Sequence, residues 1–133
     1  METPGVLFAQ TLWYAKGLAE QTTGNLEVIA PAETVVPDDL WQRDTDACCA
    51  IRKVAPLEHA LANKSAWITG LRRDDSASRA NTPLVSHDML RDVIKVNPLA
   101  NFTQSDYDKY LEVHGLNEHP LTTQGYTSIG CWP

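Results

Sequence analysis

The sequence predicts an α/β domain with a largely parallel sheet. Helical and strand-like patterns alternate along the chain, the predicted strands are short apolar runs, and 133 residues are enough to bury a core. Hydrophobic residues make up 43% of the chain and charged residues 21%, as in ordinary globular proteins. The sequence has no internal repeat, low-complexity tract or domain boundary. Residues 1–133 are therefore expected to form a single domain.

The first half of the chain alternates helix, strand and loop. Apolar residues recur at helical spacing over residues 7–18, and Gly24 follows as a stop signal, which predicts a helix. Residues 26–30 form a short apolar run ended by a proline, which predicts a buried strand. Residues 31–47 are polar and contain two prolines, so we expect mostly loop with one helical turn near residues 37–41.

The second half repeats this alternation. Residues 51–61 have a helical period that includes a proline, and residues 66–70 form an apolar run that ends in glycine. Residues 72–83 are a polar loop, and residues 93–96 form another strand closed by Asn-Pro. Residues 103–114 predict a helix with a threonine or serine cap at its start and a glycine after its end.

Composition excludes some classes of function. A net charge of −6 argues against general affinity for nucleic acids. No apolar run approaches the roughly 20 residues of a membrane span, and the first residues lack the basic region of a signal peptide. We therefore expect a cytoplasmic protein that binds neither nucleic acid nor membrane, and the sequence is compatible with a homo-oligomer. Three cysteines are an odd number, which in a reducing cytosol indicates metal-binding or catalytic thiols.

The cysteines are the strongest candidates for a metal site. Cys48 and Cys49 are adjacent, and Cys131 follows far downstream in a Gly-Cys-Trp-Pro segment. Such a set of thiolates is typical of an iron–sulfur site. Zinc with His114 or His119 as a fourth ligand is an alternative, and so is a pair of buried, inert cysteines. Spacing alone does not decide among these interpretations.

The loop that follows residues 66–70 predicts an anion site. Arg72, Arg73 and Arg79 come directly after the strand end, where ligands gather in parallel α/β sheets. Guanidinium groups bind phosphate and sulfate oxygens as a planar fork, and Gly70 lets a ligand approach the backbone. The alternative is a solvated loop in which two neighbouring aspartates neutralise the arginines.

Four segments, in this order, resemble the assimilatory adenylyl-sulfate reductases of the phosphoadenylyl-sulfate reductase family. They are CCAIRKVAPL at 48–57, AWITGLRRD at 66–74, KVNPL at 95–99 and GYTSIGCWP at 125–133. The resemblance runs from about Gly5 to the end of the sequence. It implies a partial doubly wound, mostly parallel sheet of the adenine-nucleotide alpha-hydrolase-like type.

The resemblance also implies a [4Fe-4S] cluster held by a Cys-Cys pair and a C-x-x-C pair. Cys48, Cys49 and Cys131 match three of those four ligands. The Cys-Cys pair favours the cluster-bearing branch over members that use phosphoadenylyl sulfate without a cluster. By the same resemblance, Lys53 pairs with cluster and substrate, and Gly70 lies at the adenosine. The arginines in or near the phosphosulfate pocket are Arg72, Arg73 and Arg79.

The implied reaction reduces adenylyl sulfate to sulfite and AMP through an S-sulfocysteine intermediate, with thioredoxin or glutaredoxin as thiol donor, in cysteine biosynthesis. The family's N-terminal phosphate loop, its fourth cluster cysteine and its nucleophilic cysteine have no match within residues 1–133. The nucleophile is therefore expected beyond Pro133, and residues 1–133 alone are expected to be inactive. Asp75 replaces a usual glutamine. The alternatives are a phosphoadenylyl-sulfate reductase and a redox-inactive, metal-stabilised nucleotide-binding remnant.

Overall fold

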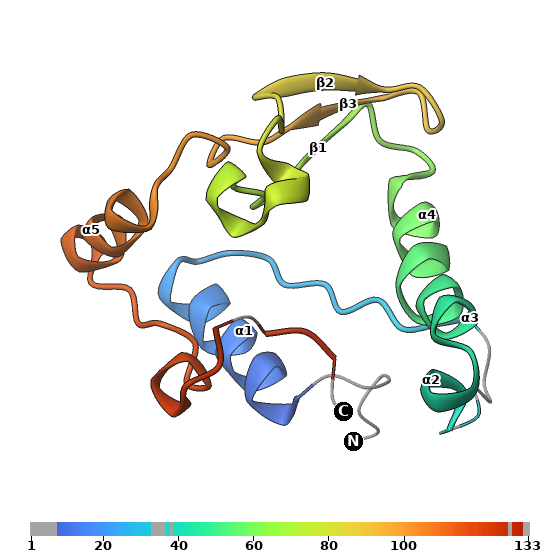
Figure 1. The fold of residues 1–133 in the computed structure, drawn as a ribbon, viewed down its shortest axis with the longest axis horizontal. Coiled ribbons are helices and arrows are strands. Elements are labelled where there is room, and N and C mark those ends of the chain that lie inside the picture. Colours follow the sequence, from blue (N-terminus) through green and yellow to red (C-terminus); the bar gives the residue numbers. More distant parts are fainter. Residues whose placement is uncertain (1–7, 33–36, 38, 128, 132–133) are drawn as a thin grey trace. The chain divides into compact units, whose positions relative to one another are not determined.

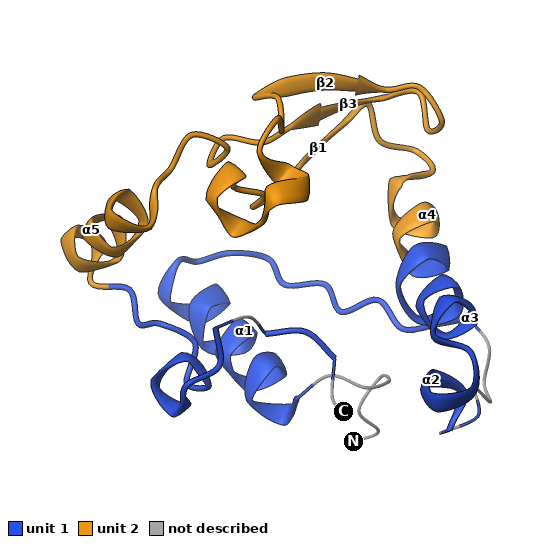
Figure 2. Cartoon of the chain, in the orientation of Figure 1, with its two compact units in different colours: residues 1–56, 116–133 blue, residues 57–115 orange. Residues whose placement is uncertain are grey.

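The structure is a computed structural model that describes residues 8–32, 37, 39–127 and 129–131. The chain divides into two compact units, one formed by residues 1–56 with 116–133 and the other by residues 57–115 (Figure 2). Helices occur in both units, and the second unit contains a sheet, so the predicted α/β class is confirmed. Within the described residues, no helix combines the length and the apolar character that a membrane crossing requires.

The sheet has three strands in the order β1-β3-β2 (Figure 1). β1 (Ala66–Ile68) pairs in parallel with β3 (Val93–Val96), with Ala66 opposite Ile94, so the strands predicted at residues 66–70 and 93–96 are both confirmed. β2 (Val85–Asp88) pairs antiparallel with β3 and was not predicted. The sheet is therefore mixed rather than mostly parallel.

A tight connection explains why β2 folds back on β3. The Asp88 carboxylate accepts hydrogen bonds from the backbone N–H groups of Leu90 and Arg91 at 3.2 and 3.3 Å. The guanidinium of Arg91 in turn binds Asp88 at 2.6 Å and Glu58 at 2.5 Å. Local polar contacts, and not a long β-branched run, thus specify this hairpin.

Asn97 fastens the end of β3 to the two segments beside it. Its side chain is 1% exposed. Its Nδ2 donates to the carbonyl of Pro83 at 2.8 Å, and its Oδ1 accepts a hydrogen bond from the hydroxyl of Thr69. Because Thr69 directly precedes Gly70, this contact places the start of the arginine loop. The buried apolar residues of this unit are Leu61, Val93, Ala100 and Leu111.

The helix predicted over residues 51–61 begins earlier than expected. After α2 (Leu40–Arg43), one helical path runs through α3 (Thr45–Cys49), a π-helix (Ala50–Val54) and α4 (Ala55–Leu61). The side chain of Asp44 caps α3 by accepting from the N–H of Ala47 at 2.9 Å. The expected loop therefore ends at this cap, and both cysteines of the pair lie on a helix rather than ahead of one.

The strand predicted at residues 26–30 is not formed. α1 (Ala9–Gln21) confirms the first predicted helix, but residues 24–31 run as an extended segment without strand pairing (Figure 1). An apolar run becomes a strand only when a neighbouring strand satisfies its backbone groups. None of the described strands pairs with this segment, and the side chains of Leu26, Val28 and Ile29 are exposed.

α5 (Gln104–His114) confirms the last predicted helix. The hydroxyl of Thr103 accepts from the N–H of Asp106 at 3.2 Å, and the N–H of Thr103 donates to the Asp106 carboxylate at 3.0 Å. This reciprocal capping box satisfies two backbone donors at the helix start. Gly115, with φ +61°, ends the helix in the left-handed conformation that glycine adopts without strain.

Thr103→Ala is expected to lower the free energy of unfolding by about 1 kcal/mol, because it removes the cap acceptor. Thr103→Ser, which keeps the hydroxyl, is the matched control and should retain most of the stability.

The hydroxyl and backbone N–H of Thr103 hold the pKa of Asp106 below its usual value. The stability that Asp106 contributes is thus present above the unfolded pKa of about 3.9 and lost as the pH falls through the lower folded pKa. Urea unfolding at pH 7 and pH 3 tests both points, and equal stability of the alanine and serine variants at pH 7 would contradict the assignment.

Candidate functional site

The three cysteines line one cavity of about 330 Å³ in the first unit. None of them forms a disulfide. The structure therefore brings together the residues that the sequence predicted as metal ligands, although Cys131 is distant from the other two along the chain. The lining residues are Trp41, Thr45, Cys48, Cys49, Arg52, Lys53 and Cys131.

Helical spacing places the cationic side chains beside the thiols. Cys48 and Arg52 are four residues apart, as are Cys49 and Lys53, and residues at this spacing share a helix face. The π-helix that carries both cations follows directly after the cysteine pair, and such segments often occur at functional sites. Cys48 is 5% exposed, whereas Cys49 is half-buried.

Lys53 is electrostatically adapted to this cavity. A hydrogen bond to Cys131 raises the pKa of Lys53 above the ordinary value, partial burial opposes this, and electrostatic interactions with Cys131, Cys49 and Cys48 add to the increase. The ammonium group is therefore charged at neutral pH and lies within electrostatic range of all three cysteines. A fixed positive charge beside sulfur ligands suits a site for an anionic metal–thiolate group.

Three thiols around one cavity are donors of the type that iron–sulfur clusters use. Among the residues that the structure describes, no group of three or more His, Cys, Asp or Glu side chains is arranged to hold a single metal ion. A [4Fe-4S] cluster asks for a different arrangement, because its thiolates are spread over separate iron atoms and do not converge on one point. Cys48, Cys49 and Cys131 supply three of the four thiols that such a cluster uses.

His119 has another role than the zinc ligand considered from the sequence. Its Nε2 lies 3.1 Å from the hydroxyl of Thr11, and its Nδ1 accepts from the N–H of Leu121 at 3.2 Å. Tyr14 packs against the same ring and donates its hydroxyl to the carbonyl of Asn117 at 2.6 Å. These contacts fasten the segment that leads to Cys131 onto α1.

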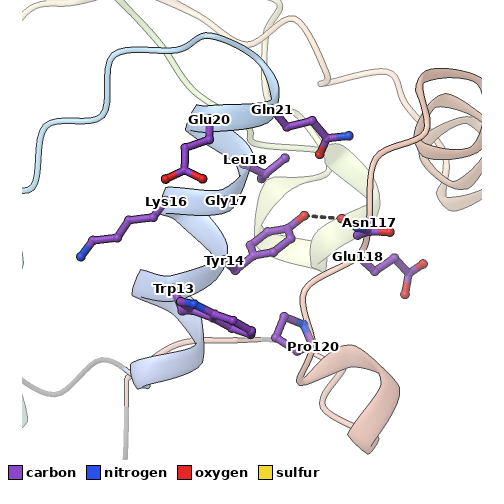
Figure 3. Close-up of a pocket in the computed structure, with 10 residues that line it drawn as sticks. All are labelled: Trp13, Tyr14, Lys16, Gly17, Leu18, Glu20, Gln21, Asn117, Glu118 and Pro120. Carbon is purple, nitrogen blue, oxygen red and sulfur yellow. Dashed lines mark hydrogen bonds between the residues drawn. The ribbon is translucent and has the colours of Figure 1, made fainter.

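A second cavity, of about 530 Å³, lies between α1 and this same segment (Figure 3). Trp13 and Tyr14 from the helix face Asn117 and Pro120 across it. None of the sequence-predicted site residues lines it. It contributes to the candidate site indirectly, through the hydrogen bond between Tyr14 and Asn117 that anchors the chain ahead of Cys131.

The second unit contains the predicted arginine loop, and Arg72 is held firmly there. Its Nε binds Asp75 at 3.0 Å, its Nη2 binds Gln104 at 3.0 Å, and its guanidinium lies 4.9 Å from the ring centroid of Tyr107. Its Nη1 is buried without a hydrogen-bond partner among the described residues. A buried donor without a partner is costly, so this atom is suited to receive an acceptor from a ligand.

Arg73 and Arg79 differ in how freely they can reach a ligand. Arg73 donates to the carbonyl of Thr82 at 2.8 Å and to Asn101 at 2.5 Å, so its guanidinium braces the loop. Within the part of the chain that the structure describes, the guanidinium of Arg79 pairs with Asp75 alone, at 3.2 Å, and the side chain is 46% exposed. The position where Gly70 lacks a Cβ has no atom within 4 Å, which leaves room for a ligand to approach the backbone.

The sequence reasoning missed several partners of these residues. Arg52 lines the cysteine cavity, and its spacing from Cys48 was an available signal. Asn101 and Gln104 hold the arginines from the start of α5, and no local pattern connects them to the loop. The aspartate pairing that was weighed as an alternative is present, because Asp75 binds both Arg72 and Arg79.

Comparison with known proteins identifies the family. The phosphoadenosine phosphosulfate reductase domain matches residues 3–133. The chain belongs to this family. The adenosine 5′-phosphosulfate reductase of Streptomyces coelicolor is 42% identical over 135 residues, which cover 97% of this chain and 57% of that protein. The reductase of the same name from Salinibacter ruber is 48% identical over 96 residues, which cover 72% of this chain and 38% of that protein.

A solved structure shows the same fold. The phosphoadenylyl-sulfate reductase from Candida auris, crystallised as a phosphate complex, matches with a TM-score of 0.80 and 24% identity over 95% of this chain and 64% of that chain. The reductase-family fold implied by the sequence resemblance is thus confirmed. The chain spans 57% of the length of the Streptomyces coelicolor relative.

Proposed function

We propose that the protein containing this chain reduces adenylyl sulfate to sulfite and AMP in assimilatory sulfate reduction and cysteine biosynthesis. The observation that carries this proposal is the cavity that gathers Cys48, Cys49 and Cys131 around Lys53. The names of the relatives at about 40% identity support the same substrate. We infer that both compact units belong to one nucleotide-binding reductase domain.

The three cysteines are proposed to hold a [4Fe-4S] cluster, with the fourth thiolate supplied by a cysteine outside residues 1–133. When bound, such a cluster supplies a charged iron–sulfur centre at the cavity. Lys53 is then proposed to face both the cluster and the anionic substrate. Its raised pKa supports this role, because the ammonium group remains charged over the pH range of a cytoplasmic enzyme.

The proposed chemistry is attack of a cysteine thiolate on the sulfur atom of adenylyl sulfate. An S–S bond forms, the bond between sulfur and the phosphate oxygen breaks, and AMP leaves. A thiol of thioredoxin or glutaredoxin then attacks the S-sulfocysteine, which releases sulfite and leaves a disulfide. Because Cys48, Cys49 and Cys131 are assigned to iron, the nucleophile is proposed to be a different cysteine, outside residues 1–133.

The arginine loop is proposed to bind the phosphosulfate end of the substrate, and Gly70 to lie at the adenosine. The side chain of Arg79 is 46% exposed, against 16% for Arg72, and it is suited to direct contact with the anion. Arg72 offers its buried Nη1, and Arg73 keeps the loop in shape through Thr82 and Asn101. These groups would also stabilise the charge that develops on the departing phosphate.

Arg79→Ala is expected to weaken adenylyl sulfate binding by about 1.5–3 kcal/mol, the usual worth of a hydrogen bond to a charged group. Arg43→Ala is a matched control, since Arg43 is an exposed arginine that also pairs with an aspartate. Calorimetric titration of both variants measures the effect. Unchanged affinity in the Arg79 variant would remove this residue from the proposed substrate site.

The substrate is tested by titrating the protein, expressed from its complete reading frame, with adenylyl sulfate and with phosphoadenylyl sulfate. Tighter binding and faster turnover of adenylyl sulfate are expected. A preference for the 3′-phosphorylated nucleotide would instead indicate a phosphoadenylyl-sulfate reductase. If neither nucleotide binds, the proposed function is wrong.

A further inference from the structure

Asp75 occupies the centre of the arginine loop. It accepts hydrogen bonds from the backbone N–H of Arg72 at 3.1 Å and from Arg72 Nε at 3.0 Å, and it pairs with Arg79 Nη1 at 3.2 Å. Its side chain is 24% exposed. One carboxylate therefore neutralises part of the charge on two of the three arginines that are proposed to bind the anion.

Its environment keeps Asp75 ionised. Partial burial opposes ionisation, but the backbone N–H and guanidinium of Arg72 and the guanidinium of Arg79 outweigh it and lower the pKa of Asp75. A negative charge is thus present in the loop at neutral pH. An anionic ligand that approaches Arg79 must displace this carboxylate or share the guanidinium with it, and it is also repelled by the remaining charge.

We propose that Asp75 competes with the anionic end of the ligand for Arg79 and so weakens the binding of that ligand. This inference rests on the proposed role of the loop in binding a sulfate or phosphate group. Arg72 has other partners in Gln104 and Tyr107, so it stays in place when the carboxylate charge is removed. The guanidinium of Arg79 has no other hydrogen-bond partner among the described residues, so removal of the carboxylate charge releases this guanidinium.

Asp75→Asn isolates the charge. An asparagine Oδ1 still accepts from the N–H of Arg72, so the backbone turn at Arg73–Asp75 is retained while the competing charge is removed. We expect adenylyl sulfate to bind about two- to fivefold more tightly, the range of partly exposed ion pairs. The gain should shrink as salt is raised, because the charges concerned are partly exposed. Affinity for adenosine, which lacks the anion, should stay unchanged.

Three further variants make the test specific. Asp39→Asn removes a carboxylate from the exposed pair with Arg43 and should leave adenylyl sulfate affinity unchanged. Asp75→Asn in the Arg79→Ala background should give little or no gain in affinity, because the guanidinium that the asparagine variant would free has already been removed. Asp75→Gln, which also removes the charge, replaces the asparagine variant if that variant fails to fold.

The outcomes separate the two claims. Tighter binding in Asp75→Asn but not in Asp39→Asn supports the proposal. Equal affinity in the wild type and both Asp75 variants overturns it and leaves the proposed function standing. Weaker binding in the Asp75 variants, or a parallel change in adenosine affinity, would show that the carboxylate only organises the loop and likewise overturns it. No binding of adenylyl sulfate to any form overturns both claims.

Discussion

Replacing Cys48 by serine is expected to remove iron from the protein and to reduce sulfite formation by more than about 100-fold. Mutating a residue that only hydrogen-bonds a metal ligand typically costs about 10- to 100-fold, and loss of a ligand itself should cost more. Cys48 is the most deeply buried of the three thiols, and it lies on the capped helix α3. A serine hydroxyl has nearly the same shape but is a poor ligand for iron that prefers soft thiolates. Iron and acid-labile sulfide per chain, measured after anaerobic purification, test the loss.

Thr45→Ala is the matched control for this experiment. Thr45 lines the same cavity but carries no thiol, and its hydroxyl donates to the carbonyl of Trp41 at 3.1 Å. Iron content close to that of the wild type is expected. A Cys48→Ser protein with full iron and activity would remove Cys48 from the cluster. A wild-type protein that carries stoichiometric zinc and no iron would reject the cluster altogether.

Asn97→Ala is expected to lower the free energy of unfolding by about 1–3 kcal/mol, because alanine cannot replace the two hydrogen bonds that this buried side chain makes. The carbonyl of Pro83 and the hydroxyl of Thr69 both depend on this side chain, which is 1% exposed. Thr69 leads into Gly70, so substrate affinity should fall together with stability. Chemical unfolding and calorimetric titration of the same preparation measure both quantities.

Asn63→Ala provides the comparison for Asn97. Asn63 is an exposed asparagine in the same compact unit, and its replacement should change stability by less than about 0.5 kcal/mol. Similar losses in the two variants would show that the buried hydrogen bonds of Asn97 do not stabilise the strand end.

The cysteine site was the most predictable part of the molecule. Thiols carry their chemistry in their residue type, and the positions of Cys48, Cys49 and Cys131 within family-like segments indicated that they lie together. The structure gathers them around one cavity. Residues 66–70 and 93–96 were equally recognisable as strands, because both are apolar runs bounded by glycine or proline, and the structure pairs them in parallel.

Features that depend on distant partners were not predictable. β2 (Val85–Asp88) contains a single β-branched residue, and its pairing depends on the Asp88 turn and on β3. Residues 26–30 are apolar enough to predict a strand. Apolar composition indicates a tendency to be buried, but it does not determine whether another strand is available for pairing. The helix starts at Thr45 because Asp44 caps it. This capping residue could not be recognised in the sequence, because the surrounding segment is also polar.

The roles of the individual arginines in the loop could not be predicted from the sequence. The residue types indicated an anion site and also its alternative, a loop neutralised by its own aspartates. The structure contains features of both, since Asp75 pairs with Arg72 and Arg79 while Arg79 remains half-exposed. Which arginines brace the loop and which can reach a ligand depends on contacts with Asn101 and Gln104, far along the chain.

Sulfite release is the measurement that tests the central claim most directly. The protein expressed from its complete reading frame is purified anaerobically and mixed with adenylyl sulfate, thioredoxin and a thioredoxin-reducing system. The account predicts one sulfite and one AMP per adenylyl sulfate consumed, at a rate on the order of 1 per second or more, with iron and sulfide present. Absence of sulfite in a folded, iron-loaded protein that binds adenylyl sulfate would contradict it.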